Sequence, residues 1–156
     1  MSRPIKVAIA GLGNRGRDNY GKIGMLYPDK MEIVAAADID PKKVALAAEE
    51  FRLPGEACFS SAEEMLAREK LADAMVIATQ DRQHVGHAIA ALEKGYHLLL
   101  EKPVSPKVRE CQRLAEAAKR CGRKVVVCHV LRYTPIYQKV KELLEEGVIG
   151  DVVSIM

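Results

Sequence analysis

The chain has 156 residues, 49% of them hydrophobic and 29% charged, which is typical of a single water-soluble globular domain. Its formal net charge of +3 is small, and acidic residues alternate with basic ones, so nucleic acid is not an expected partner. The sequence has no apolar stretch long enough to cross a bilayer and no signal-peptide pattern, so we expect no membrane partner and a cytoplasmic location.

The first predicted element is a buried parallel strand over residues 5–10, and three glycines follow it at Gly11, Gly13 and Gly16. A helix is expected from about residue 14 to residue 27. In such a G-x-G-x-x-G turn, the first glycine allows a tight turn and the second lets backbone approach a pyrophosphate. The third lets the helix lie close to the sheet, and the helix N-terminus offers free N–H groups to phosphate. Because the glycines stand between a strand and a helix, they indicate a dinucleotide-binding turn.

A second strand is predicted over residues 31–38, and it ends on Asp38, 22 positions after Gly16. A carboxylate at this place accepts hydrogen bonds from an adenosine ribose and repels a 2′-phosphate, which favours NAD over NADP. The alternative is that Asp38 only caps the following turn. NADP also stays open, because basic side chains that could accommodate a phosphate lie nearby, at Arg15, Arg17, Lys42 and Lys43.

Strands and helices continue to alternate to the end of the chain. Helices are predicted after Asp40-Pro41, after the capping box Ser61-x-x-Glu64, over 84–94, after Ser105-Pro106 and after Thr134-Pro135. Strands are predicted over 57–59, 74–78, 96–100 and 124–130. The helix after Ser105-Pro106 is expected to bury Val108, and the last helix is expected to bury Ile136, Val140, Leu143 and Leu144.

This alternation predicts an α/β fold: a doubly wound, mostly parallel Rossmann sheet of order 3-2-1-4-5-6, with helices on both faces. We assign residues 1–150 to this dinucleotide-binding domain. Residues 151–156 read as the first strand of a C-terminal substrate and oligomerisation domain that this chain lacks, because an unpaired apolar strand is a poor terminus.

Lys102 is the strongest catalytic candidate. It follows an apolar strand at the edge of the sheet where ligands bind, between Glu101 and Pro103. A partly desolvated ammonium there could bind a substrate oxygen and stabilise the charge that changes during hydride transfer. The alternative is a surface lysine in a loop between a strand and a helix.

The histidines and cysteines support no metal site, because their spacing matches no ligand pattern. His84, at the start of a helix, either lies near the cofactor or is satisfied by backbone groups. His87 and His97 are expected to be structural or exposed, and the four cysteines to be buried free thiols.

Several segments together resemble the Gfo/Idh/MocA family of nicotinamide-dependent oxidoreductases: AGLGNRGR, the later Asp38, ATQDRQH, GYHLLLEKPVS and HVLRYTP. The resemblance covers essentially the whole chain, and Glu101-Lys102-Pro103 is its most specific part. It implies an N-terminal Rossmann domain that binds NAD or NADP, followed by a C-terminal α/β domain through which the proteins form homo-oligomers. It also implies hydride transfer to or from sugars, inositols and related polyols.

The resemblance also implies roles for single residues. Lys102 would contact the reacting oxygen, and Glu101 would lie with it beside the nicotinamide, while Asp38 would bind the ribose. Gln80 and Asp81 depart from the Pro-Asn that is commoner in the family. The expected cofactor-binding residues are Gly11, Gly13, Asn14, Arg15, Gly16, Asp38, Thr79, His84, Glu101, Lys102 and Arg132.

The sequence thus predicts the cofactor-binding part of an NAD(P)-dependent dehydrogenase that acts on CH–OH groups. Without a second domain, the chain is expected to bind cofactor weakly and to turn over no substrate. A different class remains open, namely a non-catalytic module that senses the dinucleotide. A reductase of an imine or a small aldehyde is a further alternative.

Overall fold

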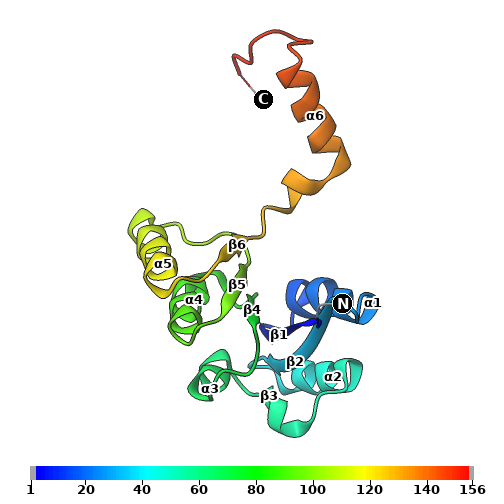
Figure 1. Ribbon diagram of the computed structural model, residues 1–156, viewed down its shortest axis with the longest axis vertical. Coiled ribbons are helices and arrows are strands. Elements are labelled where there is room, and N and C mark those ends of the chain that lie inside the picture. The colour runs from blue at the N-terminus through cyan, green and yellow to red at the C-terminus, as the bar shows by residue number, and fades with distance from the viewer. Residues whose placement is uncertain (1–2, 155–156) are drawn as a thin grey trace.

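The computed structural model describes residues 3–154 and contains one six-stranded sheet of order β3-β2-β1-β4-β5-β6 (Figure 1). Every pairing of neighbouring strands is parallel, so the predicted doubly wound sheet and its order are confirmed. The strands are β1 (Ile5–Ala10), β2 (Met31–Ala37), β3 (Cys58–Phe59), β4 (Ala74–Ile77), β5 (His97–Leu100) and β6 (Val125–Val127).

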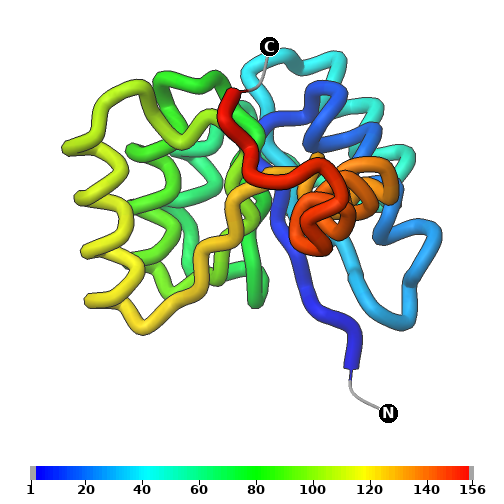
Figure 2. The backbone as a smooth tube through the Cα atoms, turned by 90° about the horizontal axis from the view of Figure 1, so that it is seen from above, coloured from blue at the N-terminus to red at the C-terminus, as the bar shows by residue number. Residues whose placement is uncertain are grey.

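Helices cover both faces of the sheet, as predicted (Figure 1 and, from above, Figure 2). One layer holds α3 (Ala62–Ala67), α4 (His84–Glu93) and α5 (Val108–Cys121), whose buried side chains include Met65, Leu92 and Leu114. The other layer holds the π-helical segment η1 (Asn14–Gly21), α1 (Lys22–Leu26) and α2 (Pro41–Phe51), packed on Val7, Ile9 and Ile33. Short 3₁₀ turns are η2 (Gly55–Ala57), η3 (Asp81–Gln83) and η4 (Val130–Tyr133), and the last helix is α6 (Pro135–Glu145).

Helix capping mostly follows the sequence signals. The Asp40 carboxylate accepts a hydrogen bond from Lys42 N at 2.9 Å, ahead of Pro41 at the first position of α2. Ser61 Oγ accepts a bond from Glu64 N at 3.1 Å, but the Glu64 carboxylate accepts from Ser60 N and Oγ rather than from Ser61 N. In this capping box the glutamate therefore bonds to Ser60, the residue before the N-cap, instead of to the N-cap residue itself.

The start of α5 differs from the prediction. The residue before the first helical turn is Lys107, not Ser105-Pro106, and Val108 is 72% exposed instead of buried. Ser105 Oγ accepts a bond from Lys107 N at 3.0 Å and donates one to Glu110 at 2.5 Å. These bonds form a turn ahead of the helix, so α5 begins two residues later and Val108 lies on its outer side.

The last helix also departs from the prediction. It begins at Pro135 as expected, but it projects away from the sheet (Figure 1), and none of its residues is buried. Ile136 is 69% exposed and Val140 is 46% exposed, while Leu143 is 37% exposed. Its apolar stripe was correctly identified, but residues 3–154 provide no element that covers it. A strand was also predicted over residues 151–156. Residues 151–154 form no strand, and residues 155 and 156 lie outside the described residues.

The N-terminal segment is fastened to the sheet by Asp73, just before β4. Arg3 donates two hydrogen bonds of 2.8 Å to the Asp73 carboxylate, which also accepts one from Lys6 N at 3.0 Å. The bond from Arg3 is the main cause that lowers the pKa of Asp73 to about 2. Within residues 3–154, no helix combines the length and the apolar character needed to cross a membrane.

This arrangement predicts an acid-dependent loss of stability. The pKa of an aspartate in an unfolded chain is about 3.9, so the contribution of Asp73 is fully present above that pH and is lost as the pH falls towards 2. We expect Asp73→Asn to lower the urea midpoint at pH 5 to 7, with a difference from the wild type that shrinks between pH 4 and pH 2. If the difference in urea midpoint stays constant between pH 4 and pH 2, the lowered pKa of Asp73 is contradicted.

Candidate cofactor and active site

The glycine turn joins β1 to η1 at the carboxyl edge of the sheet. Gly11 has φ +93°, and a Cβ added to it would lie 2.3 Å from Ala78 O of the neighbouring loop. A Cβ on Gly16 would lie 1.8 Å from Gly11 O, whereas a Cβ on Gly13 would meet no atom within 4 Å. Gly11 and Gly16 are therefore required by packing within the protein. Gly13 borders open space, as the approach of a ligand requires.

The segment that follows the turn is suited to an anion. Among residues 3–154, no side chain caps the N-terminus of η1, and its first turn carries no acidic residue, so its backbone N–H groups can donate to phosphate oxygens. Asn14 begins this segment, and its Oδ1 accepts a hydrogen bond from Asn19 Nδ2 at 2.9 Å. The Arg15 side chain is 46% exposed, and its Nε lies 3.9 Å from the Glu101 carboxylate.

Asp38 connects the glycine turn to the next helix. Its Oδ2 accepts a hydrogen bond from Leu12 N at 2.6 Å, and its Oδ1 accepts one from Asp40 N at 2.9 Å. Asp38 thus caps this turn, as the alternative interpretation expected, and its binding to an adenosine ribose stays a prediction. Asp38 also lines one pocket together with Gly11, Gly13 and Thr79, and each carboxylate oxygen keeps a further acceptor position for a ligand.

Glu101 is a buried carboxylate, 5% exposed, one residue after β5. Its Oε1 accepts a hydrogen bond from Tyr20 OH at 2.5 Å, and its Oε2 accepts one from Lys102 N at 3.0 Å. Burial is the main cause that raises the pKa of Tyr20, so this hydroxyl keeps its proton and remains a donor. The Glu101 carboxylate is therefore shielded from solvent and holds the backbone of Lys102. No sequence motif points to Tyr20, which stands 81 positions before Glu101.

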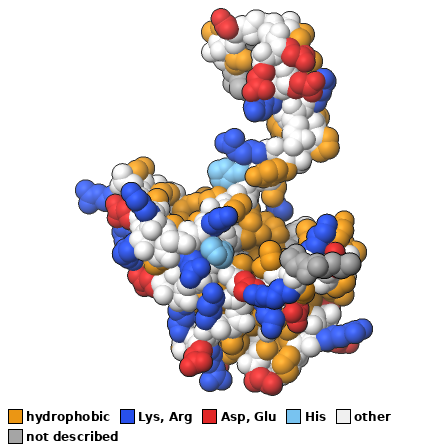
Figure 3. Space-filling view, viewed as in Figure 1, with side chains coloured by type: hydrophobic (Ala, Val, Ile, Leu, Met, Phe, Trp, Pro, Cys, Tyr) orange, Lys and Arg blue, Asp and Glu red, His pale blue; other side chains and the backbone are white. Residues whose placement is uncertain are grey.

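Lys102 itself is exposed, instead of partly desolvated as the sequence suggested. It lines a hollow at the ends of β5 and β6 together with Cys128, His129 and Arg132. Figure 3 shows hydrophobic, basic and histidine side chains gathered around the space between the sheet and α6. The structure thus brings Lys102 and Arg132 to one hollow, and it brings Asp38 and Thr79 to another on the same edge.

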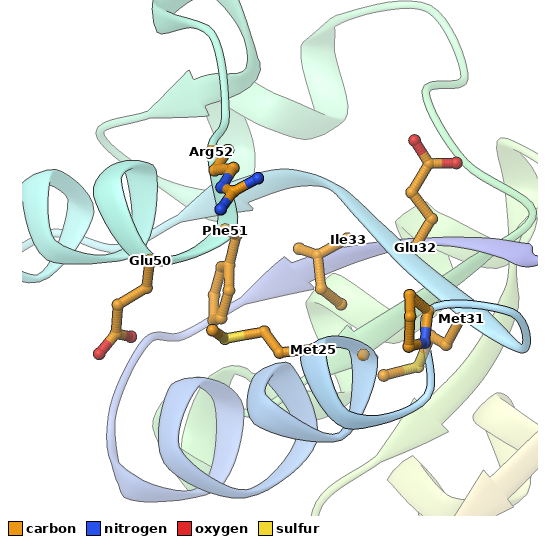
Figure 4. Close-up of a pocket in the computed structure, with 9 residues that line it drawn as sticks. Met25, Met31, Glu32, Ile33, Glu50, Phe51 and Arg52 are labelled. Atoms are coloured by element: carbon orange, nitrogen blue, oxygen red, sulfur yellow. The ribbon is translucent and has the colours of Figure 1, made fainter.

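A third hollow, lined by Met25, Ile33, Phe51 and Arg52 among others, lies between α1, α2 and the beginning of β2 (Figure 4). Met31, the first residue of β2, is part of its wall, so this hollow opens toward the amino ends of the strands. Ligands of doubly wound sheets bind at the opposite edge. We therefore exclude it as the candidate active site.

A family model described as an oxidoreductase family with an NAD-binding Rossmann fold matches residues 5–129, which include the glycine turn, Asp38 and Glu101-Lys102. The chain belongs to the Gfo/Idh/MocA oxidoreductase family. The predicted family membership and the predicted NAD-binding domain are therefore confirmed.

Members of the Gfo/Idh/MocA family resemble this chain along most of its length. Inositol 2-dehydrogenase 3 of Saccharopolyspora erythraea is 30% identical over 147 residues, which cover 94% of this chain and 42% of that protein. Oxidoreductase P35 of Formosa agariphila is 40% identical over 100 residues, which cover 64% of this chain and 31% of that protein. The chain thus spans less than half the length of these relatives.

Solved structures agree with the fold. The WlbA dehydrogenase of Bordetella pertussis, in complex with NADH and UDP-GlcNAcA, is 28% identical, with a TM-score of 0.83 over 94% of this chain and 41% of that chain. A scyllo-inositol dehydrogenase of Lactobacillus casei, with bound NAD(H) and scyllo-inositol, is 23% identical, with a TM-score of 0.84 over 96% of this chain and 43% of that chain. At 23% identity, the similarity to the Lactobacillus casei structure shows the fold alone.

His84 has a structural environment in this Gfo/Idh/MocA domain. It is 1% exposed, with Nδ1 at 2.7 Å from Pro103 O and Nε2 at 3.0 Å from Thr79 O. The interpretation that backbone groups satisfy His84 is therefore confirmed. The side chain ties the loop after β4 to the loop that carries Lys102, and a direct contact with the cofactor stays a prediction.

His87 was expected to be structural or exposed, and it is 7% exposed. It lines the same pocket as Asp38 and Thr79. No sequence pattern indicates a ligand-related role for His87, because its partners Thr79 and Glu63 stand 8 and 24 positions away in the chain.

Proposed function

We propose that this chain is the cofactor-binding part of an NAD-dependent dehydrogenase that acts on a CH–OH group of an inositol, a sugar or a related polyol. The observation that carries the proposal is the position of Lys102. Its backbone is bonded to the buried Glu101, and it stands on the same sheet edge as the NAD-binding glycine turn. Inositol and sugar-nucleotide dehydrogenases among the relatives support this substrate class.

The residues around the turn fit a bound dinucleotide. The open space at Gly13, the uncapped N-terminus of η1 and the carboxylate of Asp38 would hold its pyrophosphate and adenosine ribose. When bound, NAD supplies hydride exchange with a carbon that bears a hydroxyl or carbonyl oxygen. The Lys102 ammonium would donate a hydrogen bond to that oxygen and stabilise the charge that develops on it. Glu101, itself held by Tyr20, would keep Lys102 in place.

We further propose that residues 1–150 are followed in the intact protein by a second domain, of which residues 151–156 are the beginning. The relatives support this, because the chain covers only 42% of the inositol dehydrogenase from S. erythraea. That domain would supply the proton acceptor and most substrate contacts, and it would mediate assembly into a cytoplasmic homo-oligomer. The 156-residue chain by itself would then bind NAD without measurable turnover, and a steady-state dehydrogenase rate from it would contradict this division.

The cofactor preference gives the most direct test of the site. We expect calorimetric titration to show that NAD binds at least about tenfold more tightly than NADP, because the Asp38 carboxylate repels a 2′-phosphate. Asp38→Asn is the matched variant, since its amide oxygen can still accept from Leu12 N while the charge and the bond from Asp40 N are lost. This variant should lower the ratio of NAD affinity to NADP affinity. Tighter binding of NADP by the wild type would refute the role given to Asp38.

A further inference from the structure

A buried histidine connects two side chains at the pocket that Asp38 lines. His87 Nδ1 lies 3.0 Å from Thr79 Oγ1, and His87 Nε2 lies 2.9 Å from Glu63 Oε1. The three residues come from the loop after β4, from α4 and from α3, and all of them border the pocket of Gly11, Gly13 and Asp38. We call Glu63, His87 and Thr79 the relay.

The Glu63 carboxylate sets the direction of its hydrogen bond with His87, and the direction of the bond between His87 and Thr79 then follows for the neutral form of the imidazole. The bond from His87 is the main cause that lowers the pKa of Glu63, so this carboxylate is ionised at neutral pH and only accepts. His87 Nε2 must then carry the proton. In a neutral imidazole Nδ1 is left as an acceptor, and Thr79 has to donate its only proton to it. The lone pairs of the Thr79 hydroxyl are then left to accept from a ligand in the pocket that Thr79 lines.

We propose that Glu63 and His87 fix the Thr79 hydroxyl as a hydrogen-bond acceptor that selects a donor group on the adenosine half of NAD. The inference rests on the proposed function and extends it with residues for cofactor specificity. Two groups of adenosine have the required chemistry, namely the exocyclic amine of the base and a ribose hydroxyl. A ligand with a carbonyl oxygen at the same place would bring its lone pairs against those of the Thr79 hydroxyl, so no hydrogen bond would form.

A variant of Glu63 separates this role from simple packing. Glu63→Gln keeps the length of the side chain, but its amide offers His87 either a donor or an acceptor, so the proton on the imidazole is no longer fixed. Glu64→Gln is the matched control, because it removes the same charge from the same helix at a residue whose hydrogen-bond partners outside its own helix, in the described part of the chain, are Ser60 and Ser61. Thr79→Val removes the hydroxyl, and Thr79→Ser restores it.

The test is calorimetric titration of the wild type and these variants with NAD and with nicotinamide hypoxanthine dinucleotide, in which a carbonyl replaces the base amine. We expect Glu63→Gln and Thr79→Val to weaken NAD binding about five- to tenfold, and Glu64→Gln and Thr79→Ser to keep wild-type affinity. If only NAD binding weakens, the donor is the base amine, and if both dinucleotides weaken equally, it is a ribose hydroxyl.

Unchanged NAD affinity in Glu63→Gln or in Thr79→Val would overturn the relay while leaving the proposed function intact. The same holds if Thr79→Val weakens binding and Glu63→Gln does not, since Glu63 would then have no part in orienting the hydroxyl. A wild-type chain that binds neither dinucleotide would overturn the proposed function together with the relay.

Discussion

Gly16→Ala is expected to destabilise the domain by at least about 3 kcal/mol, more than most substitutions that overpack a core. The new Cβ would lie 1.8 Å from Gly11 O, 3.0 Å from Gly11 C and 3.1 Å from Ile9 Cγ2. Two of these atoms belong to the backbone of the turn, so no side-chain rotation relieves the clash. The helical segment would have to move off β1, although alanine is intrinsically the better helix former by about 1 kcal/mol.

Gly13→Ala is the matched control for this prediction. Gly13 has φ −75°, and no heavy atom lies within 4 Å of its added Cβ, so urea unfolding followed by circular dichroism should show little change. The variant should nevertheless bind NAD more weakly, because the methyl group would occupy space that a pyrophosphate needs. Wild-type stability of Gly16→Ala would show that η1 does not need its close contact with the turn.

Lys102→Ala is expected to lower kcat by about 10² to 10⁴ in the intact protein, with NAD affinity changed less than about threefold. The reason is that Lys102 Nζ forms no ion pair within residues 3–154, while the backbone of Lys102 is bonded to a buried carboxylate. Such a side chain contributes little to the fold and stays free to bind a substrate oxygen. Steady-state kinetics with a polyol substrate, together with calorimetry of NAD, measures both quantities.

Lys107→Ala is a suitable control, because Lys107 is an exposed lysine in the same loop whose ammonium pairs with Glu110. It should retain wild-type kcat. If Lys102→Ala keeps full turnover as well, the lysine has no catalytic role, and a domain that only senses the dinucleotide becomes the better interpretation.

The order of the sheet was predictable because each parallel strand is a short apolar run bounded by turn residues. The glycine turn, Asp38 and Lys102 were found for a related reason, since all of them follow the end of a strand. Val108 was predicted wrongly because the Ser105 turn delays the start of α5, and Ile136 because helical periodicity identifies an apolar stripe but not whether another element covers it.

The contacts that complete the site were not predictable from the sequence. Tyr20 bonds to Glu101 across 81 positions, and Glu63 bonds to His87 across 24 positions. No spacing rule links such residues, because their approach depends on how η1, α3 and α4 pack on the sheet. Only the fold shows that Tyr20 contacts Glu101 and that Glu63 acts on Thr79 through His87. Glu101 and Thr79 are residues that the sequence had already identified.

The hydrogen bond from Leu12 N to Asp38 has a consequence for engineering a switch to NADP. Replacing Asp38 with a small apolar residue would remove the repulsive charge, but it would also leave a part-buried N–H of the turn without its acceptor. A better design keeps an oxygen at position 38, as asparagine does, and introduces the positive charge at Ile39. That side chain is 81% exposed and borders the same pocket, so an arginine there would cost little in packing.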